Sequence, residues 1–444
     1  MGKINKMNGA RPVKITIYRG TKEVGGTMIE LQTGKTRLLL DAGYPLFYRG
    51  EVIDDRWAKK PYQELFDLEV IPKVRGLYRW DEPAFDAVLI SHAHSDHFGL
   101  LKYVHPGIPI HLSETTDRLI DRNISFPIPG YSRRDRRLFR MYEPFSVGDF
   151  TVKPCLMDHS AFQAAAFEIR SEGKTLLYTG DFRGHGRRRE YLERFLREAK
   201  KEADLLLIEG TTLDRTGEAE RTEEELTEEI RQTIMNSRGI VLCQPTAQNI
   251  DRVISFYQAA KACGKIFVMD LYTANLMNEL KKMGHESLPA PSVLRPDVRV
   301  YAPRELTRKM EELLGKKNIR RFPLCGISDR MIGLTQDRIV MLVRPSALPD
   351  LERMNLKNGI LIYSQWQAYR EKSYQVRLEE NLRLRGFDDC YLHTSGHAFK
   401  EDIKKVITGL SPKKIVPIHT FRPEAFYRFH HNVSLQQDGV PFDL

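Results

Sequence analysis

Short runs of apolar residues, separated by polar residues and glycines, dominate the first 209 residues of the chain. Short apolar runs bounded by turn residues are typical of buried β-strands. The pattern predicts strands over residues 15–18, 28–31, 36–40, 87–90, 175–178 and 205–208. Several of these runs end at polar residues of chemical interest, namely Asp41, the histidine-rich segment from His92, Asp181 and Glu209. We therefore expect strands whose end loops present these side chains.

The pattern changes after Glu209, where predicted strands alternate with predicted helices. Thr222 and Glu225 have the spacing of a capping box, which marks the start of a helix. Further helices are predicted at 249–263, 274–283 and 306–314, between strands at 239–243, 266–270, 298–301, 339–343 and 359–363. This alternation is typical of a doubly wound parallel sheet.

The last segment returns to strands that end at polar residues. Helices are predicted at 376–384 and 402–410, and a strand at 415–418 leads directly to His419. We therefore predict an α/β protein in which residues 1–209 form the first part of one domain and residues 366–444 complete it. An α/β domain over residues 210–365 is inserted between the two parts.

The net charge of the chain indicates which class of partner it binds. The formal charge of +10 favours a polyanion, with nucleic acid first, although solubility alone also explains such an excess. Arginines cluster at 132–140 and 187–189. The first cluster is flanked by the aromatic residues Tyr131, Phe139 and Tyr142. These side chains could stack on nucleic-acid bases, or they could pack beneath a loop.

Other features of the sequence bear on the cellular compartment of the protein. No apolar run approaches the roughly 20 residues that a membrane helix needs, and the chain begins without the apolar core of a signal peptide. The five scattered cysteines include no C-x-x-C pair, so we expect reduced thiols rather than disulfides or a thiolate zinc site. These features predict a cytoplasmic protein without a membrane partner.

The segment from Ser91 to His97 reads S-H-A-H-S-D-H and is the strongest chemical signal in the chain. Imidazole nitrogens and carboxylate oxygens are good ligands for zinc and related ions. In an extended segment, side chains two residues apart point to the same side, so His92 and His94 can bind one ion. Asp96 and His97 are then available to a second ion.

Two metals need more ligands than this segment offers. His159 would complete a set with His92 and His94, and His419 would join Asp96 and His97. Asp181 is the candidate for a carboxylate that bridges both ions, which suits a metal pair about 3.5–4 Å apart. Asp41 we expect behind the ligands, where it would fix the tautomer of a histidine, unless it only forms a turn before Gly43.

A further loop, Ser395-Gly396-His397, has the composition of a phosphate-binding segment. Glycine permits close approach of the backbone to a ligand, and the helix predicted after it supplies free N–H groups. His397 could steady a phosphate oxygen or protonate a leaving alkoxide. Glu209 is its expected partner. The predicted catalytic residues are Asp96, Asp181, Glu209 and His397.

These residues resemble the metallo-β-lactamase fold, and the inserted α/β domain resembles that of the β-CASP nucleases, most closely the RNase J-like branch. His92, His94, Asp96 and His97 match the H-x-H-x-D-H motif. The other matches follow family order: Asp41, His159, Asp181, Glu209 (motif A), His397 (motif B) and His419 (motif C). The resemblance implies an αββα sandwich with an inserted β-CASP-type domain.

The resemblance also implies a function, a two-zinc phosphodiesterase that hydrolyses RNA, with manganese as the alternative metal. In having a histidine at motif C, the chain resembles the RNA-processing members of the family. The competing interpretations are a DNA nuclease, a small-molecule metallo-hydrolase and a non-catalytic binding subunit, and the sequence does not decide between exonuclease and endonuclease action. Because the chain ends about 25 residues after His419, we expect it to lack the extra C-terminal domain that typical RNase J proteins use in dimer assembly. A homodimer is possible, but the sequence does not decide the oligomeric state.

Overall fold

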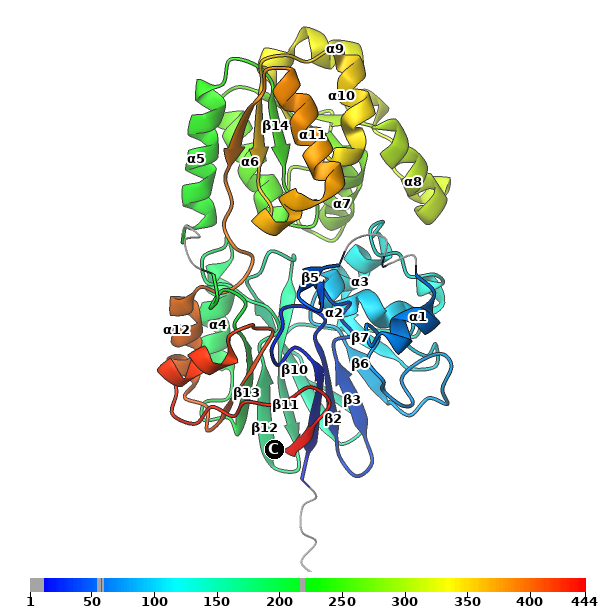
Figure 1. The fold of residues 1–444 in the computed structure, drawn as a ribbon, viewed down its shortest axis with the longest axis vertical. Coiled ribbons are helices and arrows are strands. Elements are labelled where there is room, and N and C mark those ends of the chain that lie inside the picture. Colours follow the sequence, from blue (N-terminus) through cyan, green and yellow to red (C-terminus); the bar gives the residue numbers. More distant parts are fainter. Residues whose placement is uncertain (1–11, 54–56, 58–59, 216–219) are drawn as a thin grey trace, which may run out of the picture.

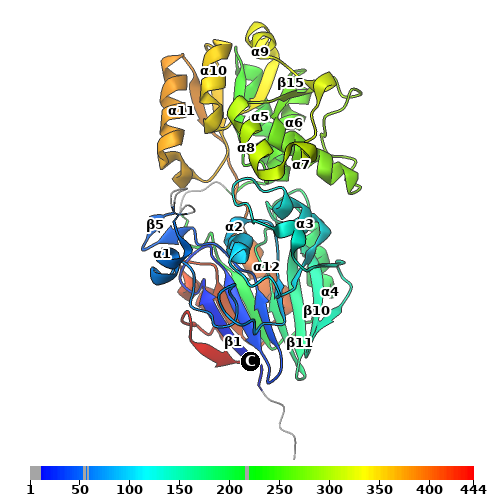
Figure 2. The ribbon, with the colours of Figure 1, turned by 90° about the vertical axis from the view of Figure 1, so that its right-hand side faces the viewer.

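The computed structural model describes residues 12–53, 57, 60–215 and 220–444 (Figure 1). The chain forms two bodies stacked along the long axis of the molecule (Figures 1 and 2). The lower body contains two packed sheets, and the upper body contains a third sheet with helices α5 to α11. No helix in the described part of the chain is long and apolar enough to span a membrane.

The first sheet of the lower body has the strand order β21-β1-β2-β3-β6-β7-β8. Its strands from β3 to β8 run parallel to one another. Its members are β1 (Lys14–Arg19), β2 (Met28–Gln32), β3 (Arg37–Leu40), β6 (Ala87–Leu89), β7 (Ile110–Ser113), β8 (Arg136–Phe139) and β21 (Pro441–Asp443).

The second sheet has the order β20-β13-β12-β11-β10-β9, with β12, β13 and β20 parallel. Its members are β9 (Phe145–Val147), β10 (Phe150–Met157), β11 (Ala164–Ser171), β12 (Lys174–Tyr178), β13 (Leu205–Glu209) and β20 (Ile415–Ile418). A short hairpin pairs β4 (Phe47–Tyr48) with β5 (Glu51–Val52).

The apolar core explains why these runs are strands. Leu205 and Leu207 pack between the two sheets, whereas Leu206 and Ile208 pack under helices on the other face. A strand buried on both faces is apolar throughout, as this run is. The helices of the lower body cover the outer faces (Figure 1): α1 (Tyr62–Asp67), α2 (Ser95–Phe98), α3 (Glu114–Asp121), α4 (Arg189–Glu198) and α12 (Lys400–Leu410).

The upper body has an all-parallel sheet in the order β16-β15-β17-β14-β18-β19. The strands are β14 (Val241–Gln244), β15 (Ile266–Asp270), β16 (Val298–Tyr301), β17 (Ile339–Leu342), β18 (Ile360–Tyr363) and β19 (Asp388–Tyr391). The helices are α5 (Glu223–Asn236), α6 (Ile250–Ala262), α7 (Leu271–Lys282), α8 (Arg304–Leu314), α9 (Asp329–Leu334), α10 (Leu348–Met354) and α11 (Ser373–Leu384). Helix α5 begins at the capping box of Thr222 and Glu225.

This architecture confirms the predicted α/β fold class, a sandwich with an inserted doubly wound sheet. The end of the inserted part differs from the predicted boundary at 365. Strand β19 pairs with β18, and Leu378 and Leu382 of α11 pack into the core of the third sheet. The upper body therefore extends to Tyr391. Strand β19 was not predicted because it begins with two aspartates and has no apolar run.

Candidate metal centre

The candidate ligands come from loops at one edge of the lower body. Asp41 follows β3, His92 follows β6, Asp181 follows β12 and His419 follows β20. Because these strands are parallel to their neighbours, their carboxyl ends meet at the same edge. The loops pack tightly there: a Cβ atom on Gly43 would lie 1.9 Å from the carbonyl oxygen of Asp96, so only glycine fits this position.

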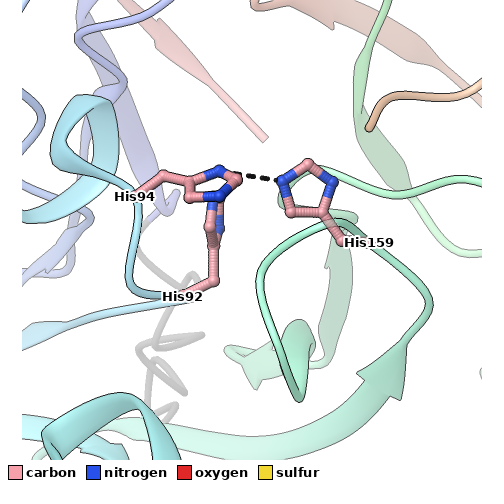
Figure 3. A group of neighbouring side chains, drawn as sticks. All are labelled: His92, His94 and His159. Atoms are coloured by element: carbon pink, nitrogen blue, oxygen red, sulfur yellow. Dashed lines mark hydrogen bonds between the residues drawn. The ribbon is translucent and has the colours of Figure 1, made fainter. Parts of the chain in front are cut away.

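One cluster of three histidines has the composition of a zinc site. The ligand atoms of His92, His94 and His159 all lie within 4.8 Å of one another (Figure 3). His159 Nε2 lies 3.1 Å from His94 Nδ1, and His92 Nε2 is buried without a hydrogen-bond partner in the described part of the chain. An unpartnered buried nitrogen beside two other imidazoles fits the role of a metal ligand.

The protonation of this cluster suits a metal. Burial, together with the neighbouring imidazoles, holds the pKa of His92 and of His159 well below the usual range. Burial likewise lowers the pKa of His94 to about 4. All three rings are therefore neutral at pH 7, and neutral imidazole is the form that binds a metal.

A second cluster joins two carboxylates to two histidines, and the ligand atoms of Asp96, His97, Asp181 and His419 lie within 4.8 Å of one another. His97 Nε2 lies 3.1 Å from Asp181 Oδ2, and His419 Nε2 lies 3.3 Å from Asp96 Oδ2. Asp181 Oδ2 is also 3.8 Å from His92 Nε2 and 4.0 Å from His159 Nε2. This oxygen therefore lies within 4.0 Å of nitrogen atoms from both clusters.

The charges in the second cluster favour a cation. Although burial acts against ionisation, the nearby histidines hold the pKa of Asp181 well below its usual range and lower that of Asp96 to about 2. Burial lowers the pKa of His97, but Asp181 and Asp41 outweigh it and raise this pKa well above its usual range. The two carboxylates thus create a negative potential that a bound metal cation would compensate.

Asp41 lies behind the candidate ligands, at the position that we predicted from the sequence. Its Oδ2 atom is 2.7 Å from His97 Nδ1 and accepts hydrogen bonds from Ser91 Oγ at 2.7 Å and Tyr178 Oη at 2.5 Å. Asp41 is fully buried and has a positive φ of 57°, which only tight local packing maintains. This arrangement fixes the His97 ring through Nδ1 and directs its Nε2 atom toward Asp181 and the rest of the second cluster.

Glu209 and His397 form a further group beside the metal ligands. His397 Nδ1 lies 3.3 Å from the carboxylate of Glu209 and 3.5 Å from Asp181 Oδ2. The ligand atoms of Glu209, His397, Asp181 and His419 also lie within 4.8 Å of one another, so these four residues form a third group that could hold a metal ion. The Glu209 carboxylate already accepts hydrogen bonds from the backbone N–H groups of Phe182 and Thr211, which leaves it less available to a metal than the carboxylates of Asp96 and Asp181.

The loop that carries His397 lies against the loop that carries His159. A Cβ atom on Gly396 would lie 2.4 Å from Ser160 Oγ and 3.6 Å from His159 Cε1. Ser395 Oγ accepts a hydrogen bond from the backbone N–H of His397 at 3.1 Å. The structure thus brings Ser395, Gly396 and His397 beside the histidine cluster.

Several arginines of the two predicted clusters make internal contacts, whereas Arg133, Arg137 and Arg140 are exposed. Tyr131 and Phe139 are buried, and Arg136 forms an ion pair with Asp117 at 2.9 Å. These aromatic residues therefore pack beneath the loop rather than stack on bases. In the second cluster, Arg187 donates hydrogen bonds to Thr227 and Ser255, and Arg188 pairs with Asp251.

Several contributors carry no signal in the sequence. Tyr178 and Ser91 support Asp41, and Thr211 Oγ1 lies 2.8 Å from His419 Nδ1. Only the position of Ser91 beside the histidine segment could have drawn attention. The roles of Tyr178 and Thr211 depend on contacts between strands that are distant in the chain.

Comparisons with known proteins agree with this geometry. Residues 66–240 match a beta-lactamase superfamily domain, and residues 390–425 match a Zn-dependent metallo-hydrolase RNA specificity domain. A crystal structure of a protein of unknown function from Enterococcus faecalis V583 superimposes with a TM-score of 0.78 over 98% of this chain and 100% of the other, at 22% identity.

Several relatives of this chain are named as ribonucleases. Ribonuclease J of Helicobacter pylori strain 26695 is 24% identical over 98% of this chain and 59% of its own length, and that of Sinorhizobium meliloti is 24% identical over 80% of this chain and 60% of its own. The chain thus spans about three fifths of the length of these relatives. In its fold, its matched domains and its histidine and aspartate clusters, the chain is similar to the metallo-β-lactamase superfamily and, within it, to the RNase J-like β-CASP proteins.

Proposed function

We propose that this chain is a metal-dependent phosphodiesterase that hydrolyses RNA. One observation carries the proposal: Asp181 Oδ2 lies within 4.0 Å of nitrogen atoms of both histidine-containing clusters. His92, His94 and His159 would hold one zinc ion, and Asp96, His97 and His419 the other, with Asp181 between them. Manganese is the alternative metal for the same nitrogen and oxygen donors.

When bound, a zinc pair supplies Lewis acidity toward a phosphate and a water-derived nucleophile at neutral pH. The protein's own groups do the rest. Asp41 holds the His97 ring in one orientation. The His397 side chain is 18% exposed, whereas Asp181 and Glu209 beside it are buried, so His397 is the group able to reach substrate. We assign to it the donation of a proton to the leaving oxygen, or stabilisation of the charge that develops there, with Glu209 setting its orientation.

RNA is the substrate that several observations support. The named relatives are ribonucleases, and the matched RNA specificity domain contains Ser395, His397 and His419. The charge of +10 suits a polyanion and predicts cleavage that weakens as salt rises. A cytoplasmic location and a homodimer are further parts of the proposal.

The test is digestion of matched RNA and DNA strands by zinc-loaded protein. We expect cleavage of RNA that ceases after chelation and returns on addition of zinc. DNA cleavage at an equal rate would favour the competing DNA nuclease, and a loaded protein inert on both would contradict the proposal.

The same assay with varied RNA ends separates the two modes of action. Circular RNA is cut only by an endonuclease, whereas strict dependence on a 5′-monophosphate indicates a 5′-exonuclease. His397→Ala should lower turnover far more than RNA binding. An equal loss in both would make His397 a binding residue.

A further inference from the structure

His185 lies four residues after Asp181, in the loop between β12 and α4, and has no role in the mechanism above. It is 7% exposed and lies beneath the loop that carries His397. Its ring stacks on Phe399, with the ring centroids 3.9 Å apart and the planes at 20°. A histidine held this closely beside a reactive loop has a defined orientation.

The hydrogen bonds of His185 fasten two loops together. Its Nε2 atom lies 2.9 Å from the carbonyl oxygen of Ser395, and since a carbonyl only accepts, Nε2 is the donor. Its Nδ1 atom lies 3.3 Å from Asp402 Oδ2. The same carboxylate oxygen accepts hydrogen bonds from the backbone N–H groups of Gly184 at 3.0 Å and Phe399 at 3.2 Å. The loop after Asp181 is therefore tied to the start of α12.

The Ser395 carbonyl oxygen receives a second donor from the same loop. Arg183 Nη1 lies 3.3 Å from it, and the arginine is fully buried. Glu223 and Asp251, both in helices of the upper body, hold the guanidinium at 3.2 and 2.7 Å. Arg183 and His185 thus fix the Ser395 carbonyl from two directions.

The position of Ser395 determines that of His397. Ser395 Oγ accepts from the His397 backbone N–H, and Gly396 between them has no free space beside Ser160. A shift of the Ser395 carbonyl would therefore move the His397 ring, which now lies 3.5 Å from Asp181. Displacement of a reacting group by about 1 Å costs on the order of a hundredfold in rate.

We propose that His185 is a positioning residue for phosphodiester cleavage, acting through the hydrogen bond that its Nε2 atom donates to Ser395. This inference rests on the proposed function, because His397 must act on the substrate for its position to matter. Among the described residues, no hydrogen bond or ion pair joins His185 to a candidate metal ligand.

The test compares variants that keep or remove the donor. His185→Phe preserves the stack on Phe399 and removes the hydrogen bond, whereas His185→Gln offers an amide donor. We expect His185→Phe to lower kcat on RNA by up to about a hundredfold at unchanged KM and zinc content, and His185→Gln to recover much of the loss. His431→Phe, at an exposed position, is the control. If His185→Phe does not fold, His185→Met against His185→Gln repeats the comparison at equal side-chain length.

A double-mutant cycle separates positioning from general damage. In the His397→Ala background, the His185→Phe substitution should cost nothing further, because the group that it positions is absent. A full additional loss, or wild-type turnover in His185→Phe alone, would overturn the proposal. A wild-type protein that cleaves no RNA under these conditions would overturn the proposed function and this inference with it.

Discussion

His97 Nδ1 lies 2.7 Å from a carboxylate oxygen of Asp41, although 56 residues separate the two in the chain. Asp41→Asn keeps the shape of the side chain but can present an amide N–H to His97 in place of an oxygen. We expect a loss of about tenfold to a hundredfold in zinc affinity or activity. Zinc titration and RNA cleavage measure it, with Asp67→Asn at an exposed helical position as the control. Equal behaviour of the two variants would contradict the role assigned to Asp41.

Removal of the first metal site should abolish turnover. His92 is fully buried, and its Nε2 atom faces the cluster without another partner in the described residues. We expect His92→Ala to bind less zinc than the wild type and to cleave RNA at background rate, whereas His431→Ala keeps both properties. Elemental analysis and a cleavage assay provide the measurements. A full zinc content in His92→Ala would remove this residue from the ligand set.

The buried carboxylate of Asp158 predicts a pH effect on stability. Burial raises its pKa to about 7, above the value of about 3.9 in an unfolded chain. Between these two values the native state holds a proton that the unfolded state has lost, so this group lowers the free energy of unfolding as pH rises. The limiting slope is about 1.4 kcal/mol per pH unit.

Asp158→Asn cannot titrate and should lack this contribution. Urea unfolding of metal-free protein from pH 5 to 7.5 should therefore show a gap between wild type and variant that changes with pH. Parallel profiles would show that Asp158 is already ionised in the native state.

Glu223 predicts a large effect on stability. It is fully buried between Arg183 at 3.2 Å and Arg252 at 2.9 Å. Glu223→Ala leaves two buried guanidinium groups undercompensated, which typically costs about 3–5 kcal/mol. Glu224→Ala is the matched control, because this neighbour is exposed and lies 3.9 Å from an exposed Arg189, a pair worth about 0–1 kcal/mol. Denaturant unfolding compares them, and similar midpoints would contradict the prediction.

Strands buried on both faces were predictable from sequence, and others were not. The run at 205–208 is wholly apolar because both faces of β13 are covered. Strand β11 begins with three alanines, which have low β propensity, and it forms because it pairs with β10 and β12. Strand β8 carries two arginines, so its sequence resembles a basic surface segment.

The candidate ligands were predictable because metal chemistry restricts the residue types and their spacing. His92, His94, Asp96 and His97 lie within one short loop, and strand ends supply the rest. The supporting residues were not predictable in the same way. Arg183 and His185 acquire their roles only where the chain returns at Ser395, more than 200 residues later.

The ionic network around Glu223 also constrains how such proteins can diverge. Arg183 belongs to the lower body, and Arg252 and Asp251 belong to the upper one, yet all are buried and share partners. A chimera that joins the upper body of one homologue to the lower body of another would inherit unmatched charges unless these residues are exchanged together. Recombination between distant lineages should therefore succeed only when this whole set is transferred as a block.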